Sequence, residues 1–304
     1  MTTTVRSIHR FPVKSMLGET LTECSVDAGG LLGDRAYALL DVERGTIASA
    51  KDPRRWGALL DFSAAFVSEP VAGEAAPVVD LVFPDGSRHR SDDPDVDDAL
   101  SAVLGCAVRL LREPPPEATF DEVWPDIDGL APQGFIDGTR HHDDEGLVVS
   151  RIGLGMMAPA GTFFDLAVLH LLTTATLARL RELATEAGSA ADFDPRRFRP
   201  NLLLDDDAGG GSGFVEDAWV GRELQVGSQP ERARLSVSMV TMRCVMTTLA
   251  QQGLPRDADT LRVVARHHRE KIPGLGTWAC AGVYGGVSGP GVVRVGDEIT
   301  LVAS

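Results

Sequence analysis

The stretch MVTMRCVMTT, residues 239–248, places a cysteine directly after a strand-like pattern. Upstream, residues 235–240 alternate mostly apolar with mostly polar side chains, as a half-buried strand does. Cys244 follows with Arg243 beside it, and a neighbouring cation favours the thiolate, the nucleophilic and metal-binding form of cysteine. A buried structural cysteine is the competing interpretation, because free cysteines are among the most buried residues in proteins.

Short strand-like runs separated by glycine turns extend on both sides of this stretch. The expected strands of the first part are 5–9, 21–26, 37–41, 59–67, 78–83 and 107–111. Those of the second part are 168–172, 222–226, 235–240, 281–287, 291–295 and 298–302. This pattern predicts an α+β fold, in which a mainly β-barrel domain at 165–304 packs against a smaller β-rich domain at 1–112.

Three helices are expected between these strands, at residues 93–104, 173–187 and 255–271. The first has an apolar stripe of Val96, Leu100 and Val103. The third carries His267 and His268, which are expected at the surface because arginines flank them. The Asp85–Gly86 pair, just after Phe83 at the end of an expected strand, predicts a hairpin turn.

Residues 113–164 are rich in proline, glycine and charge, which is typical of functional or flexible loops, so we interpret them as a linker and pocket rim. Within them, His141–Glu145 contains metal-ligating residue types. Adjacent side chains do not readily converge on one ion, which favours a solvated loop instead. The run GGGSG at 209–213 is expected to be a flexible loop without a phosphate role, because it lacks the Lys-Ser/Thr of a P-loop.

Composition narrows the classes of partner. The 304-residue chain has a net charge of -15, so nucleic acid and anionic membranes are poor expected partners. The chain shows neither a hydrophobic signal core nor a run long enough to span a membrane, and we expect a cytoplasmic protein. No C-x-x-C pair occurs, which argues against a zinc finger or an additional iron–sulfur module. The four cysteines are Cys24, Cys106, Cys244 and Cys280.

Three further groups of residues suit anion binding. The loop 193–201, FDPRRFRPN, concentrates arginines in an otherwise acidic chain and ends in Asn201, so it reads as an anion cradle or as a solvated face paired with its own aspartates. Lys14 and Ser15 lie on a Pro/Gly loop, and a tight glycine connection leads to Arg35. Threonines at 173–176 open the second expected helix, where they either cap it or mark backbone N–H groups open to an anion.

Five motifs in this order resemble the MOSC family, named for the C-terminal domain of molybdenum cofactor sulfurases, together with its N-terminal β-barrel partner domain. The resemblance is closest to the two-domain reductases typified by the mitochondrial amidoxime-reducing component and its bacterial relatives. The motifs are RFPVKS at 10–15, GLLGDRAYALLD at 30–41, DPRRFRPNLLLD at 194–205, MRCVMTT at 242–248 and GVYGGVSGPGVVRVGDEITL at 282–301.

The resemblance implies a molybdopterin cofactor in a cleft between two domains, with Cys244 as the ligand to molybdenum. It also implies a set of residues that hold or line the cofactor site. These are Lys14, Ser15, Arg35, Thr173, Thr176, Arg199, Asn201 and Tyr284. The residue chemistry agrees, because phosphate needs cations and hydroxyls and molybdenum needs a soft anionic ligand.

The activity implied by the resemblance is reduction of N-hydroxylated small molecules, with electrons from a separate flavin reductase or ferredoxin-type protein. A cofactor or sulfur carrier that uses Cys244 without turnover is the alternative. A third possibility is a dedicated enzyme of a biosynthetic pathway. The family usually continues with Asp-Pro after the two threonines, whereas Leu249–Gln251 follow here, and residues 113–164 form a longer segment than expected. Both departures concern the substrate more than the cofactor.

Overall fold

A closed barrel of seven strands lies at the centre of the computed structural model, which describes residues 3–206 and 213–302. Each barrel strand is hydrogen-bonded to the next around the ring, and the pairing of β18 with β13 closes the ring. In ring order they are β13 (Leu169–Thr173), β14 (Leu202–Asp206), β1 (Thr3–Arg10), β20 (Glu298–Leu301), β15 (Glu223–Val226), β16 (Ala233–Met242) and β18 (Gly276–Gly289). The predicted α+β, mainly β fold is confirmed.

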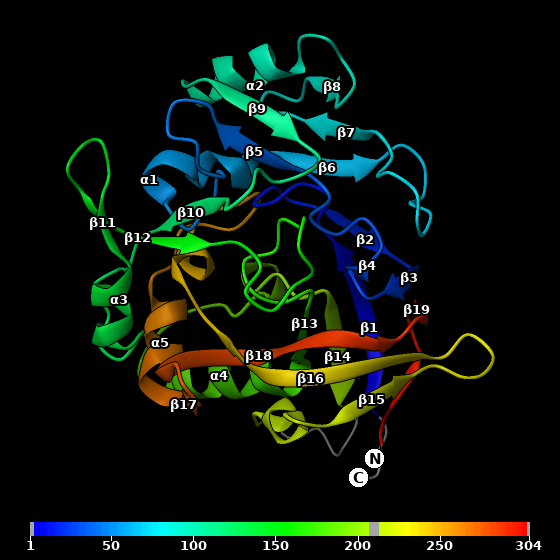
Figure 1. The fold of residues 1–304 in the computed structure, drawn as a ribbon. Coiled ribbons are helices and arrows are strands. Elements are labelled where there is room, and N and C mark those ends of the chain that lie inside the picture. The colour runs from blue at the N-terminus through cyan, green and yellow to red at the C-terminus, as the bar shows by residue number, and fades with distance from the viewer. Residues whose placement is uncertain (1–2, 207–212, 303–304) are drawn as a thin grey trace.

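Both ends of the chain enter the barrel. Strand β1 pairs antiparallel with β14 on one side and with β20 on the other (Figure 1). Strand β16 follows the predicted alternation, since Leu235, Val237 and Met239 are buried while Arg234 and Ser238 are exposed. Apolar side chains from these strands form one continuous core, so the barrel is held by burial of its apolar face.

Two helices cover the outside of the barrel. Helix α4 (Thr174–Glu186) links the parallel strands β13 and β14, and α5 (Asp259–His267) packs against it in a core that includes Leu180 and Leu261. The expected third helix is shorter than predicted, because its last residues form strand β17 (Arg269–Ile272), which pairs with β18. That change of structure buries His268, so its expected surface position is wrong.

The N-terminal module packs several small sheets around its own core. The Asp85–Gly86 turn joins β7 to β8, as predicted. Val103 is 48% exposed, so only Val96 and Leu100 of the expected stripe are buried. The module contains α1 (Pro53–Trp56), α2 (Val96–Leu104), β5 (Ala38–Asp41), β6 (Ser63–Phe66), β7 (Val79–Val82), β8 (Arg88–Arg90) and β9 (Val108–Leu111). Strand β2 (Glu19–Leu21) instead pairs with β1 of the barrel sheet. A further sheet joins β3 (Glu23–Asp27) and β4 (Gly30–Leu31) to the late strand β19 (Gly291–Arg294).

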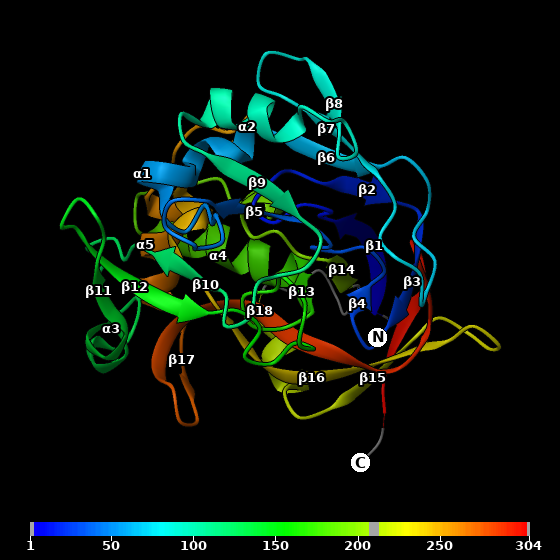
Figure 2. The same ribbon diagram turned by 45° about the horizontal axis from the view of Figure 1, so that its top comes forward.

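The expected strand at 59–67 is only half correct, because residues 57–61 form a 3-10 helix before β6. The segment 113–164 has more regular structure than a linker. It forms a three-stranded sheet with a helix, and these lie between the N-terminal module and the barrel along one side of the molecule (Figures 1 and 2). The elements are β10 (Thr119–Glu122), α3 (Gln133–Thr139), β11 (Arg140–His142) and β12 (Val148–Gly153).

Of the run His141–Glu145, the two histidines belong to β11, and Asp143 begins the turn to β12, where it accepts hydrogen bonds from the backbone N–H groups of Glu145 and Leu147. Asp143 also pairs with Arg54 of the N-terminal module. The expected loop at 209–213 lies, except for Gly213, outside the described residues. Among the described residues, no helix is long and apolar enough to cross a membrane.

Candidate functional site

A cleft lies where loops of the N-terminal module meet loops that lead into or out of barrel strands. Seven of the nine residues predicted for the site line it, although they come from five separate parts of the chain. They are Lys14, Ser15, Arg35, Arg199, Asn201, Cys244 and Tyr284. The structure therefore brings seven of the predicted residues to one cleft, although they are distant in the sequence.

Arg199 is the clearest sign that the cleft is built for an anion. One guanidinium nitrogen donates to the carbonyl oxygen of Met16 at 2.8 Å, and the group stacks 4.0 Å from the ring centre of Phe11. The other terminal nitrogen, Nη1, is buried without a hydrogen-bond partner. Burial, with repulsion from Arg35, lowers the pKa of Arg199 to about 9. A buried cation with a spare donor is stabilised by an anionic ligand.

The two lysines of the cleft share one carboxylate. The Nζ atom of Lys14 donates to the carboxylate of Asp165 and to the carbonyl oxygen of Phe163, the latter at 3.0 Å. Lys51 Nζ lies 3.2 Å from Asp165 Oδ2 and 3.2 Å from Glu122 Oε2. Burial alone would raise the pKa of Asp165, but the two ammonium groups outweigh it and hold that pKa well below its usual range. Asp165 is therefore ionised and balances part of the positive charge.

Three of the cleft residues have strained backbones. Of the non-glycine residues described, only four have positive φ angles, and three of them are Ser15 at 66°, Arg35 at 50° and Arg199 at 54°. A left-handed conformation costs a non-glycine residue on the order of 1 kcal/mol. Such strain concentrates where function requires a particular side-chain direction, so its presence at three predicted site residues supports the site independently of their charge.

Asn201 lines the cleft, but its amide is used inside the protein. Its Nδ2 donates to Asp34 at 2.8 Å and to the carbonyl oxygen of His9 at 3.2 Å, while its Oδ1 accepts from the backbone N–H of His170. Asp34 in turn pairs with Arg35. Asn201 thus positions the loop that carries Arg35, and its predicted role as a direct cofactor contact is not supported by these bonds.

Cys244 is half-buried and opens to the cleft just beyond β16. The hydroxyl of Thr247 donates to the carbonyl oxygen of Cys244 at 3.0 Å, and that of Thr248 donates to the carbonyl oxygen of Val245 at 2.7 Å. The two threonines therefore fold the short turn that presents the sulfur. Burial raises the pKa of the Cys244 thiol, and it outweighs the opposite effects of Lys51 and Arg243. Arg243 favours the thiolate, as expected, but its effect and that of Lys51 are smaller than the effect of burial.

Comparison with known families identifies the arrangement. Residues 161–300 match the MOSC domain, and residues 2–58 match the MOSC N-terminal beta barrel domain. The chain belongs to the MOSC family. MOSC domains are linked to molybdenum-cofactor proteins, which agrees with a cleft that joins a cysteine to several cations.

Solved structures and curated proteins add little to this assignment. The YUAD protein from Bacillus subtilis is 12% identical, with a TM-score of 0.43, over 99% of this chain and 96% of that one. YiiM from Geobacillus stearothermophilus is 18% identical, with a TM-score of 0.30, over 45% of this chain and 55% of that one. Neither likeness is close enough to carry a functional argument. No curated protein gives a significant match.

Thr173 and Thr176 of this MOSC protein do not line the cleft, so the structure does not bring them together with the other predicted site residues. Both are fully buried at the start of α4, and both hydroxyls donate to Glu216 Oε2, at 2.6 Å and 2.8 Å. Thr173 also caps the helix by accepting from the backbone N–H of Thr176. Burial raises the pKa of Glu216. The two threonines therefore bond to that carboxyl group, and Thr173 also caps the helix.

Sequence reasoning missed Lys51 and Asp165, which also line the cleft. Lys51 had a detectable signal, because the chain contains only three lysines and two of them, Lys14 and Lys51, converge here. Asp165 gave no such signal among the many aspartates of the chain. Its partner Lys14 is 151 positions away, so only the fold brings them together.

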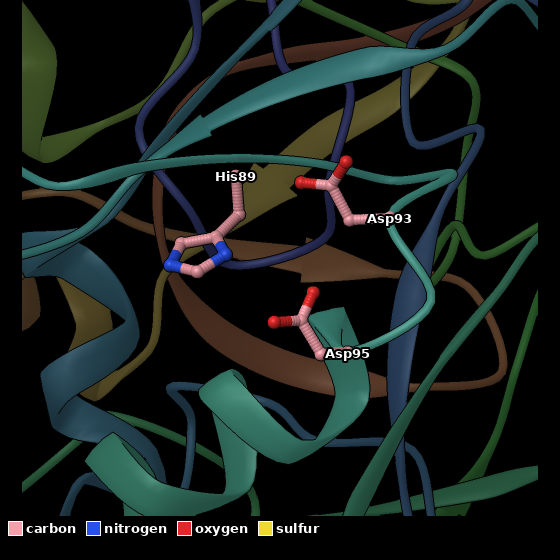
Figure 3. Close-up of side chains that lie close together, drawn as sticks. All are labelled: His89, Asp93 and Asp95. Atoms are coloured by element: carbon pink, nitrogen blue, oxygen red, sulfur yellow. The ribbon is translucent and has the colours of Figure 1, made fainter.

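Two groups of metal-ligating side chains lie apart from the cleft. His89, Asp93 and Asp95 cluster at the start of α2 (Figure 3), where Asp93 accepts a hydrogen bond from the backbone N–H of Arg90. The other group is Asp217, His268 and Glu270. In this group, His268 forms hydrogen bonds of 2.7 Å to Asp217 and to the carbonyl oxygen of Cys280. These two bonds satisfy both ring nitrogens, so the histidine can be buried.

Proposed function

We propose that this MOSC protein binds a molybdopterin-type molybdenum cofactor in the cleft and reduces N-hydroxylated small molecules. The observation that carries the proposal is the convergence of Cys244 with the buried, incompletely bonded cation of Arg199 in one cleft. A soft sulfur ligand and a phosphate-binding guanidinium are rarely needed together, but an anionic metal cofactor needs both.

The residues present fit such a group. Arg199 and Arg35 would hold the anionic part, with Phe11 stacked against both guanidinium groups. Cys244 would be the protein ligand to molybdenum, because metal binding favours the thiolate that burial disfavours. When bound, the cofactor would supply the two-electron chemistry by which an N–OH oxygen leaves as water. The protein residues bind, orient and enclose the reactants.

Asp165 has a separate part in this proposal. It holds Lys14 and Lys51 in the cleft, so a dianionic phosphate would compete with its carboxylate for the same ammonium groups. We propose electrons from a separate flavin reductase or ferredoxin-type partner and a cytoplasmic location. A carrier of cofactor or sulfur is the second candidate, because the sulfur of Cys244 opens to the cleft.

Turnover separates these candidates. The protein is purified from a host that makes the cofactor, and N-hydroxybenzamidine is supplied with a reduced flavin or ferredoxin donor. The reductase predicts formation of benzamidine, and loss of that activity in Cys244→Ala. A carrier predicts no turnover but transfer of cofactor to an acceptor protein, or a persulfide on Cys244 detected by mass spectrometry. Normal turnover by Cys244→Ala would contradict both candidates.

A further inference from the structure

A second pocket adjoins the cation-lined cleft and shares a wall with it. Lys51, Asp165, Leu166, Met242, Arg243, Cys244 and Tyr284 line both spaces. The remaining lining of this second space, here called the aromatic pocket, is almost entirely apolar. It consists of Phe120, Glu122, Trp124, Phe135, Ile152, Met156, Leu275 and Trp278. Cys244 thus stands between a cationic space and an apolar one.

Three rings form the apolar wall. The centroid of Phe135 lies 4.9 Å from that of Trp278 and 6.1 Å from that of Trp124, in edge-to-face arrangements. The indole N–H groups are already bonded, that of Trp124 to Ser150 Oγ and that of Trp278 to the carbonyl oxygen of Leu275, both at 2.8 Å. The wall therefore presents an aromatic surface to a ligand, but no free indole N–H group. Such a surface suits a flat apolar group.

The polar groups of the aromatic pocket lie together with Cys244. Glu122 is 2% exposed and bonds to Lys51 Nζ, and Lys51 also contributes to the cleft. A ligand in the pocket would therefore meet aromatic rings at one end and paired charges beside the sulfur at the other. That polarity matches a molecule with an apolar body and a small polar head.

We propose that the aromatic pocket binds the flat apolar body, preferably an aromatic ring, of the N-hydroxylated substrate, with its N–O group directed toward Cys244. This inference rests on the proposed function and extends it to a class of substrate. Trp124 and Phe135 belong to the segment 113–164, so that segment selects the substrate while the cationic cleft holds the cofactor.

Paired probes test the pocket in the protein purified from a cofactor-competent host. N-hydroxybenzamidine carries a phenyl ring, and N-hydroxyacetamidine carries a methyl group in its place. Burying the larger apolar group predicts at least about tenfold tighter binding of the phenyl probe, measured by calorimetry. Its binding should also quench the tryptophan fluorescence of the protein, and Trp124→Phe should reduce that quenching more than Trp56→Phe does.

Phe135→Ala removes one ring of the wall and should abolish most of the preference for the phenyl probe. Ile136→Ala on the same helix is the matched control, because Ile136 does not line the pocket. Molybdenum content, measured in parallel, should be unchanged in both variants. The inference is overturned if the unmodified protein binds both probes equally, or if a folded Phe135→Ala variant keeps the preference. Absence of molybdenum with intact phenyl preference would instead count against the proposed function alone.

Discussion

Lys51 Nζ lies 3.2 Å from Asp165 Oδ2, in the wall that the cationic cleft and the aromatic pocket share. The same carboxylate accepts from Lys14, so one acidic side chain bridges two of the cations that the proposed cofactor would need. Burial works to lower the pKa of Lys51, but Asp165 and Glu122 outweigh it and raise that pKa well above its usual value. Asp165 and Glu122 therefore keep Lys51 charged.

Asp165→Asn should destabilise the cofactor-free protein at neutral pH by about 1–3 kcal/mol, because two buried ammonium groups lose their shared carboxylate. The pKa of Asp165 is depressed in the folded state, so its contribution is present above the unfolded value of 3.8 and fades as the pH falls through the folded value. Urea denaturation from pH 7 to pH 2 measures this, because the loss begins below pH 3.8 and continues toward the lower folded value. An undiminished difference between the two proteins at low pH would refute the ion pairing.

Arg199→Met should separate stability from cofactor retention. The guanidinium of Arg199 is buried with an unpartnered Nη1, so its replacement should cost the cofactor-free protein little, or stabilise it by on the order of 1 kcal/mol. The same variant should lose most of its molybdenum after expression in a cofactor-competent host. Denaturation and metal analysis are the two measurements. Arg196→Met is the control, because Arg196 pairs with Asp194 at the surface. Full molybdenum retention by Arg199→Met would contradict the assigned role.

Thr176→Val should act on stability alone. It removes a hydroxyl that donates to the buried carboxyl group of Glu216 at 2.8 Å, and we expect a loss of about 1–2 kcal/mol in the free energy of unfolding. Molybdenum content should match that of the unmodified protein, because the hydroxyl lies outside the cleft. A stably folded variant that lacks molybdenum would contradict this prediction and support a cofactor role for Thr176.

His268→Gln tests the buried His268–Asp217 pair through its pH dependence. Burial favours the neutral imidazole, but the hydrogen bond to Asp217 outweighs it, and the pKa of His268 is raised above 6.5. Because the pKa is higher in the folded protein, the pair contributes its full stabilisation below pH 6.5. That stabilisation is lost as the pH rises through the folded value. The unmodified protein should therefore exceed the variant in stability most at pH 5.5 and less at pH 8.5. A difference that grows with pH would exclude the pair.

Local sequence patterns predict the strands well, because half-buried strands alternate polar and apolar side chains. Strand β16 is the clearest example. Local patterns do not predict the burial of a side chain whose contacts are distant in the sequence. His268 follows a helix among arginines, yet its ring stacks 3.5 Å from that of Phe214 and bonds to Asp217, 51 positions away. No local pattern contains that information.

Those site residues that lie within the family motifs could be predicted from the sequence. The motifs place Lys14, Arg199 and Cys244 in one cleft correctly, but they do not say which polar groups stay free for a ligand. The resemblance also implies Asn201 and Thr176, but in the structure protein groups use their hydrogen bonds. Hydrogen-bond partners depend on the complete fold, so this distinction requires the structure.

Molybdenum content tests the central claim most directly. The unmodified protein, Cys244→Ala and Cys106→Ala are purified from the same cofactor-competent host and analysed by mass spectrometry for metal per chain. Cys106 is the control, because it is a partly exposed cysteine of the N-terminal module. We predict molybdenum in a fixed ratio to the unmodified chain and to Cys106→Ala, and little in a folded Cys244→Ala. Equal molybdenum in all three proteins, or none in the unmodified one, would contradict the account.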